Sequence, residues 1–217
     1  MNINGVLYHR TTNSSGFLRL NINLNPDKYI LTVINPETNE MASALVTVLP
    51  KLVENKDLVK YYRNASKYSV KVLDDQGNTL SGVSVSFNIN GVFYYRTSNQ
   101  NGVASLNINL QPDDYIITAE YGGYRVSNNV RVLSTIKTSN LAMNYRDGSR
   151  FGALILDNNK GNPLSGVSVT FNINGVFYIR TTNSNGIAYL NINLQPGKYI
   201  ITTTYSSLNE ANTIVIK

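Results

Sequence analysis

The pattern that decides the fold is Val83-Ser84-Val85-Ser86-Phe87-Asn88-Ile89, followed by Asn90-Gly91 and then by Val92-Phe93-Tyr94. Apolar residues alternate with small polar ones, which is typical of a β-strand with one buried face. Asn-Gly between two such runs predicts a hairpin, because both residues tolerate the positive φ of a type I′ turn. A two-residue loop places Ile89 opposite Val92 and Phe87 opposite Tyr94. We therefore expect these four side chains to share the buried face.

Similar runs occupy the rest of this region. We expect strands over 68–73, 103–110, 115–120 and 126–133, separated by turns at 74–78, 99–102 and 111–114. None of these runs shows the apolar spacing of a helix. Short strands with a turn every ~8–12 residues are typical of a β-sandwich. The sequence therefore predicts an all-β protein built from antiparallel strands.

The chain also repeats itself. Residues 81–118 align without gaps on residues 165–202, and 30 of the 38 positions are identical. A partial third copy opens the chain, since residues 2–5 match 88–91 and residues 20–24 match 106–110. One extra residue, in the turn Asp157–Gly161, shifts the register between the complete copies. Repeats of about 84 residues predict a partial unit, 1–50, and two complete units, 51–134 and 135–217.

The repeat contains a recognisable composite motif. It reads Asp-x-x-Gly-Asn-x-Leu-Ser-Gly-Val-x-Val-x-Phe-Asn-Ile-Asn-Gly-Val-x-Tyr-x-Arg-Thr and continues with Asn-Gly-x-Ala-x-Leu-Asn-Ile-Asn-Leu-x-Pro-x-x-Tyr. The motif spans Asp74–Tyr115 and, with one inserted residue, Asp157–Tyr199. It resembles the tandem Ig-like repeats of adhesin-like surface proteins of methanogenic archaea. More distantly, it is similar to bacterial Ig-like (Big) and prealbumin-like surface modules.

This resemblance implies tandem Ig-like sandwiches that act as non-catalytic stalk or adhesion modules at the cell surface. Their partner would be a cell-surface or extracellular ligand, with a glycan as one candidate. Members of the family usually carry a secretion signal and an anchor, which this sequence does not show. We therefore expect the chain to be part of a longer polypeptide.

The amino-acid composition excludes several kinds of functional site. Lysine and arginine number 19 against 13 acidic residues, cysteine is absent, and the one histidine is His9. These counts exclude disulfide scaffolds, cysteine nucleophiles and multi-histidine metal centres. His9 is replaced by Tyr95 and Ile179 in the other copies, which argues against a repeated catalytic triad. We expect no enzyme activity, no cofactor and no metal, and no apolar run reaches the ~20 residues of a membrane span.

The basic residues cluster at the start of the middle unit, at Lys51, Lys56, Lys60, Arg63, Lys67 and Lys71. No nucleic-acid-binding motif accompanies them, so we expect no nucleic-acid partner.

Repeated polar residues provide the candidate ligand face. The outward asparagines are Asn88, Asn107, Asn109, Asn172, Asn191 and Asn193. Amide groups hydrogen-bond sugar hydroxyls, so a polar ladder of these residues on one sheet would form a carbohydrate-binding face; loop tips are a second location for it. The competing interpretation is a soluble sheet surface that was duplicated with the repeat. Arg10, Arg96 and Arg180 also recur, and we expect them to cap the core or pair locally.

Two further groups of residues have the types needed for calcium binding or for an isopeptide bond. The turns that begin at Asp74 and Asp157 contain several oxygen ligands, but they lack EF-hand spacing, so we favour ordinary Asx turns over calcium loops. An intramolecular isopeptide bond would require Lys71, Asn128 or Asn129, and Glu120 to converge. Alternation points Lys71 toward solvent, which argues against this bond.

The partial unit lacks the counterparts of strand 68–73 and of most of 83–89. A sandwich without these strands leaves backbone groups unpaired and apolar side chains uncovered. We expect residues 1–50 to be poorly stable or to be completed by a strand from another chain.

Overall fold

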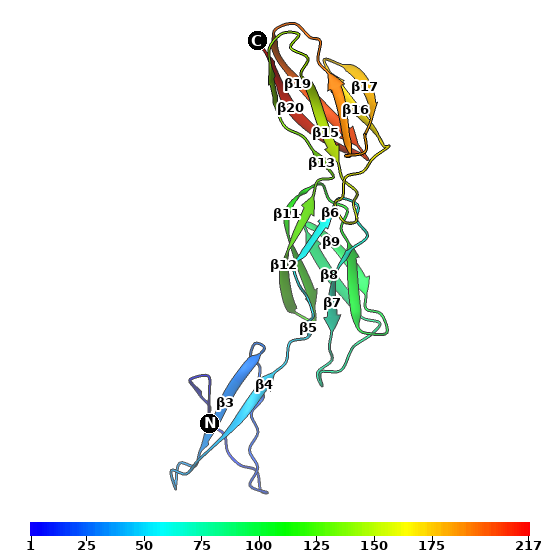
Figure 1. Cartoon of the computed structure of the whole chain (residues 1–217). Helices are drawn as coiled ribbons and strands as arrows, with labels where there is room; N and C mark the ends of the chain where they lie inside the picture. Colours follow the sequence, from blue (N-terminus) through cyan, green and yellow to red (C-terminus); the bar gives the residue numbers. More distant parts are fainter.

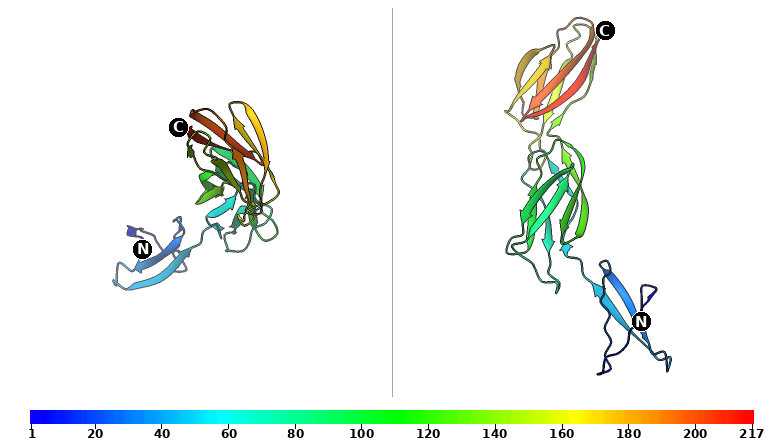
Figure 2. Two further views of the ribbon diagram at one scale, coloured as in Figure 1. Left: turned by 45° about the horizontal axis from the view of Figure 1, so that its top comes forward. Right: turned by 180° about the vertical axis from the view of Figure 1, so that it is seen from behind.

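The computed structural model describes all residues, 1–217, and consists of strands, turns and loops. The strands form three successive groups along an elongated molecule, with the N-terminal group at one end and the C-terminal group at the other (Figures 1 and 2). The boundaries expected near residues 50 and 134 fall between β4 and β5 and between β12 and β13.

The middle group has two sheets. The larger one has the order β6 (Leu58–Tyr61), β12 (Tyr124–Leu133), β11 (Asp113–Tyr121), β8 (Ser84–Ile89) and β9 (Val92–Thr97). The smaller one has the order β10 (Val103–Asn107), β7 (Lys67–Val72) and β5 (Leu52–Val53). All neighbours are antiparallel except β6, which pairs parallel to β12.

The third group repeats this topology. Its larger sheet has the order β14 (Leu141–Met143), β20 (Leu208–Ile216), β19 (Gly197–Tyr205), β16 (Ser168–Ile173) and β17 (Val176–Thr181). Its smaller sheet has the order β13 (Ile136–Lys137), β15 (Arg150–Ile155) and β18 (Ile187–Asn191). The prediction of an all-β fold made of tandem Ig-like sandwiches is thus confirmed.

Alternation fills the space between the two layers. Val85, Phe87 and Ile89 are at most 1% exposed. Phe87 meets Tyr68 of the opposite layer edge to face, with ring centroids 6.0 Å apart, and Phe171 meets Phe151 in the same way at 5.8 Å. Each buried side chain of this kind contributes ~1.5–3 kcal/mol of hydrophobic stabilisation.

The predicted hairpin has the expected register but not the expected burial. Ile89 pairs with Val92 and Phe87 with Tyr94, and both turn residues, Asn90 and Gly91, have positive φ. Val92, however, is 49% exposed, and Tyr94 is only partly buried. The expectation that all four share a buried face is therefore wrong. The five-stranded sheet is wider than the three-stranded layer, so its edge strand β9 is incompletely covered.

The first group is a single sheet, in the order β2 (Val6–Leu7), β1 (Asn2–Ile3), β3 (Asp27–Ile34) and β4 (Met41–Val48). No second layer of strands covers it within residues 1–50. Leu31 and Val33 occupy the positions of Ile117 and Ala119, which are 0% exposed in the middle unit. In the first unit these positions are only half-buried.

Candidate functional site

The asparagines predicted as a ligand face lie in two layers. Two belong to the larger sheets, Asn88 and Asn172, and four lie at or beyond the ends of strands in the smaller sheets, Asn107, Asn109, Asn191 and Asn193. The prediction of one polar ladder on one sheet is therefore wrong. The reason is that β10 crosses to the opposite layer, where it pairs with β7 instead of extending the sheet of β8.

Four of these asparagines nevertheless line a recurring feature. Asn107 and Asn109 border a hollow of about 220 Å³ at the open edge of the middle sandwich, beside Tyr94 and Leu110. The third unit has an equivalent hollow of about 340 Å³, bordered by Asn191 and Asn193. Each hollow combines an aromatic ring with amide groups, which is the mixture of apolar and hydrogen-bonding surface found in small-ligand sites.

The recurring arginines Arg10, Arg96 and Arg180 are exposed, and Arg180 lines the hollow of the third unit. Arg96 stacks over the Tyr94 ring at 5.9 Å and donates a hydrogen bond to the carbonyl of Tyr95 at 2.7 Å. Arg180 and Arg10 make the same two contacts in their own units. The expected local pairing is present, and the arginine head groups lie at the surface instead of capping the core.

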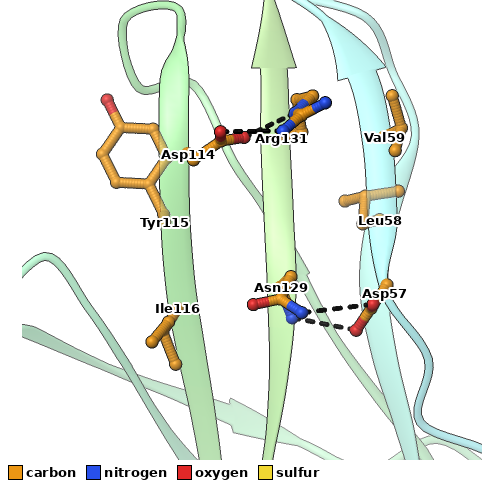
Figure 3. Close-up of a pocket in the computed structure, with 8 residues that line it drawn as sticks. All are labelled: Asp57, Leu58, Val59, Asp114, Tyr115, Ile116, Asn129 and Arg131. Carbon is orange, nitrogen blue, oxygen red and sulfur yellow. Dashed lines mark hydrogen bonds and ion pairs between the residues drawn. The ribbon is translucent and has the colours of Figure 1, made fainter.

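A second kind of hollow, of about 550 Å³, lies on the outer face of the middle unit (Figure 3). The Arg131 guanidinium bridges both oxygens of Asp114, at 2.6 and 2.9 Å. Asp57 accepts hydrogen bonds from the backbone N–H of Asn129 at 2.9 Å and from its side chain at 3.3 Å. Exposed Ile116 and Val59 form the apolar part of the surface.

Both carboxyl groups in this hollow are held in the charged form. Hydrogen bonds from Asn129 and Asn128 lower the pKa of Asp57, and the hydrogen bonds from Arg131 lower the pKa of Asp114. A general acid must keep its proton near neutral pH, so neither group fits that role. The surface provides fixed charge and hydrogen-bonding groups for binding.

The Asp114–Arg131 ion pair in this lining has no counterpart in the third unit. The third unit has Lys198 in place of Asp114 and Val215 in place of Arg131. At the position of Asp57 it has Asn140, whose Oδ1 accepts the backbone N–H of Thr213 at 2.9 Å. The shared role of Asp57 and Asn140 is therefore structural. Each joins the segment before the parallel strand to the neighbouring strand, β12 or β20.

In the acidic turns, the aspartate carboxylates accept hydrogen bonds from backbone N–H groups of the same turn. Asp74 Oδ1 accepts the N–H groups of Gln76 and Asn78 at 2.9 and 2.8 Å. Asp157 accepts the N–H groups of Asn159, Lys160 and Asn162 at 2.7–2.8 Å. These hydrogen bonds lower the pKa of both carboxyl groups. This geometry is that of Asx turns, as the sequence favoured over calcium loops.

The basic cluster does not form one cationic patch. Lys51 pairs with Asp75 at 2.7 Å and Lys71 with Glu54 at 2.9 Å. Lys60 is only 3% exposed, and its Nζ donates to the Ser66 carbonyl at 2.9 Å and to Asn107 Oδ1 at 3.3 Å. Desolvation lowers the pKa of Lys60. Sequence reasoning missed this burial, although Lys60 alternates in phase with Leu58 and Tyr62 and has Met143 as its counterpart.

The residues required for an isopeptide bond make other contacts. Lys71 pairs with Glu54 on the smaller sheet, and Glu120 pairs with Arg125 at 2.7 Å. Asn128 Oδ1 accepts from the Tyr68 hydroxyl at 2.8 Å. The structure therefore places the three predicted groups in separate interactions.

The two complete units meet in a built joint. Asn64 Nδ2 donates to the carbonyl of Asn158 at 2.7 Å, and Asn158 Nδ2 donates back to the carbonyl of Arg63 at 3.0 Å. Gly161 packs so closely against the Tyr61 phenol that an added Cβ would overlap the ring. Ser134 Oγ also donates to Glu210 Oε1 at 3.0 Å. The turn Asp157–Gly161, which carries the extra residue of the third unit, thus forms part of this contact.

Neither a family model nor a curated protein matches the sequence. Among solved structures, the chain is similar to the I9–I11 tandem of titin, with a TM-score of 0.41 and 17% identity, over 89% of this chain and 76% of that one. Similarity to the D0–D1 domain of intimin has a TM-score of 0.33 and 15% identity, over 75% and 95% of the two chains. For invasin, described as a bacterial integrin-binding protein, the TM-score is 0.33 and the identity 18%, over 76% and 38%.

These are distant similarities of fold to tandem Ig-like modules. No helix of a length and apolar character suited to crossing a bilayer occurs in the structure.

Proposed function

We propose that this chain is a non-catalytic, adhesin-like module of a cell-surface protein, and that its Ig-like units act as an extended stalk that contributes to attachment. The joint between the complete units carries the proposal. Reciprocal Asn64–Asn158 hydrogen bonds and the Tyr61–Gly161 contact fix one sandwich on the next. Such contacts favour a stiff rod over units on a loose linker, and a stiff rod holds a binding surface away from its base.

The cell-surface or extracellular location and the adhesive role are supported by the repeat motif, which resembles that of archaeal adhesin-like proteins. The topology also suits the role. Each complete unit has its own set of buried, alternating apolar residues, so the unit can be repeated along a chain. The partner on this proposal is a ligand of the cell surface or of the extracellular space.

Small-angle X-ray scattering tests the rod. We expect the pair-distance distribution of the wild-type chain to be elongated, and that of Asn64→Ala/Asn158→Ala to be broader because the joint loosens. Asn185→Ala is the matched control, because its exposed side chain makes none of the joint contacts. A wild-type distribution as broad as that of the double variant would overturn the stalk proposal.

The recurring edge hollow favours a second candidate, a carbohydrate-binding module. A tyrosine and two asparagines border the hollow in both complete units, and Arg180 also lines the hollow of the third unit. A glycan array distinguishes the two functions. Reproducible binding that falls in Asn107→Ala or Asn191→Ala, but not in Asn185→Ala, would support recognition by the repeats themselves. Absence of glycan binding by the wild-type chain would contradict this candidate and leave the spacer role.

A further inference from the structure

The outer faces of the two complete units carry opposite charges at one position of the repeat. Residues 81–118 and 165–202 differ at eight of their 38 aligned positions, and one of the eight reverses the charge: Asp114 of the middle unit is Lys198 in the third. Each is the second residue of its strand, β11 or β19, and both side chains are exposed. Two residues further along, Ile116 and Ile200 are 66% and 55% exposed. Each unit therefore presents an apolar side chain beside a charge, and the two charges are opposite.

On the middle unit this position belongs to the hollow of about 550 Å³ in Figure 3. We call its outward-facing residues the acidic surface: Asp57, Val59, Asp114, Ile116, Asn129 and Arg131. Exposed Ile116 and Val59 lie on either side of β12 (Figure 3). Isoleucine and valine thus flank the charged groups, and a partner that covers the hollow also removes apolar surface from water.

The acidic surface has one negative charge that no cation compensates. The Asp114 carboxylate is paired with the Arg131 guanidinium through two hydrogen bonds. Asp57 accepts hydrogen bonds from neutral asparagine groups and takes part in no salt bridge. The pKa of both carboxyl groups is lowered by these hydrogen bonds, so both are ionised at neutral pH. Two carboxylates and one guanidinium leave a net charge of minus one.

The third unit presents the equivalent surface with a positive charge. Strand register identifies its residues, which we call the basic surface: Ala142, Lys198, Ile200, Thr213 and Val215. Lys198 is the one charged residue among them, and no salt bridge includes it. Asn140, which replaces Asp57, adds no charge. The basic surface therefore has a net charge of plus one beside exposed Ile200.

We propose that the acidic surface of one chain binds the basic surface of a second copy of this chain. Charge complementarity identifies this occupant, because Lys198 supplies the cation that Asp57 lacks. Contact between two acidic or two basic surfaces would instead place like charges together. An antiparallel pair of chains can make both contacts at once, whereas a single contact leaves a free surface on each chain and continues into larger assemblies.

This inference goes beyond the stalk function, because a single rod can act as a stalk without binding a second rod. Side-by-side contact would gather neighbouring stalks into bundles. Each contact involves few residues and is weak alone, but rods held close together raise its effective concentration. Failure of the self-association tests would leave the Asn64–Asn158 joint and the rod untouched.

Sedimentation velocity of the full chain tests the contact. Over about 10 µM to 1 mM protein, we expect the mean mass to rise above the 24.0 kDa of one chain. Raising the salt from about 0.1 to 1 M shortens the Debye length from ~10 to ~3 Å and should return the chain to the monomer. A wild-type chain that is monomeric at every concentration in low salt would overturn the proposal.

Two variants with reversed charge test which surfaces meet. Asp57→Asn/Asp114→Asn gives the middle surface a net charge of plus one, because Arg131 remains, and Asn140 shows that the fold accepts asparagine at the first of these positions. Lys198→Glu gives the third-unit surface a net charge of minus one. Each variant alone then presents like charges, and its association constant should be about tenfold or more below that of the wild type.

Mixing the two variants restores the opposite charges. The unchanged acidic surface of the Lys198→Glu chain then meets the unchanged basic surface of the other variant. We expect the equimolar mixture to associate about as strongly as the wild type. A mixture that associates no more than either variant alone would overturn the pairing of these surfaces.

Lys137→Glu is the matched control. It makes the same change in net charge as Lys198→Glu, but on an exposed residue of β13, in the smaller sheet. This control should associate like the wild type. An equal loss in both variants would assign the effect to overall charge, and association that survives Lys198→Glu would place the contact elsewhere on the chain. Either result would overturn the proposal.

Discussion

The Lys60 ammonium donates a hydrogen bond to Asn107 Oδ1 across 3.3 Å, joining the larger sheet of the middle unit to the end of the smaller one. Lys60 is 3% exposed, so this charge is held where an apolar side chain would otherwise pack. Met143 occupies the equivalent position of the third unit and is 6% exposed. The same buried position thus holds a charged side chain in one unit and an apolar side chain in the other.

We expect Lys60→Met to stabilise the middle unit by about 1 kcal/mol, because an apolar side chain avoids the desolvation of the ammonium group. The substitution leaves the Ser66 carbonyl and Asn107 Oδ1 without the lysine donor, but both residues are exposed, so water can replace it. The reciprocal change, Met143→Lys, should destabilise the third unit. Chemical denaturation of the full chain measures both, and a Lys60→Met chain less stable than wild type would contradict the expectation.

The same lysine predicts a dependence on pH. Its folded-state pKa lies below the ordinary 10.5, so the unfolded chain binds more protons between these two values. The stability of the wild type relative to Lys60→Met should therefore rise with pH through this window and reach a plateau above about 10.5. Denaturation midpoints of the two proteins from pH 7 to 11 provide the measurement. A constant difference across this range would show that Lys60 does not titrate abnormally.

The stability of the middle unit should depend on the hydrogen bonds of the Ser98 hydroxyl. Its buried Oγ donates to the Leu80 carbonyl at 2.8 Å and accepts the Val83 N–H at 3.1 Å. Ser98→Ala should cost ~1–3 kcal/mol, because two backbone groups lose their partner. Ser98→Thr is the matched control, since Thr182 makes the same two bonds in the third unit. Equal stability of the alanine and threonine variants would contradict this role.

Substitution of Gly161 should change the contact between the two complete units. Gly161→Ala adds a Cβ that overlaps the Tyr61 phenol, at a residue whose φ is +74°. Gly166→Ala is matched in backbone strain, with φ of +75°, but its Cβ would meet nothing within 4 Å. Both variants should lose ~1 kcal/mol from the left-handed backbone conformation. Only Gly161→Ala should also alter the scattering profile, and an unchanged profile would contradict a close-packed joint.

Asp57 predicts a loss of stability in acid. Its pKa is lowered in the folded state by hydrogen bonds from Asn129 and Asn128, so its contribution is present above the unfolded pKa of about 3.9. That contribution is lost as pH falls through the lower folded value. Asp57→Asn should keep the neutral-pH fold, as Asn140 does in the third unit, but should lack this component. Thermal midpoints from pH 2 to 6 compare the two, and parallel curves would refute the assignment.

The sequence predicted well wherever a property depends on near neighbours. The Asn90-Gly91 turn, the pairing of Phe87 with Tyr94 and the Asx turn at Asp74 all follow from residue type and spacing. Prediction was less successful for side-chain exposure, which depends on the second sheet of the sandwich. The exposure of Val92 depends on how far the smaller sheet extends, and alternation along one strand contains no such information.

The same holds for the candidate site residues: their polarity follows from the sequence, but their neighbours in space depend on the tertiary structure. Asn107 was identified as outward and polar, but its position beside Tyr94, and the separation of Asn88 into another layer, depend on the crossing of β10. Lys60 was grouped with the other basic residues of 51–71, and its phase in the alternation, which indicates burial, was overlooked.

By itself, the sequence determined the alternation of apolar residues and the turns, because these depend on residues a few positions apart, and its self-similarity revealed the repeats. Only the tertiary structure decided which strands share a layer, which polar groups meet and where one unit contacts the next. The segment Leu-Asn-Ile-Asn-Leu shows why: it begins in a strand at 106–110 and forms none at 20–24. A β-strand is completed by hydrogen bonds to a partner distant in sequence, so the same residues take different structures when that partner is present or absent.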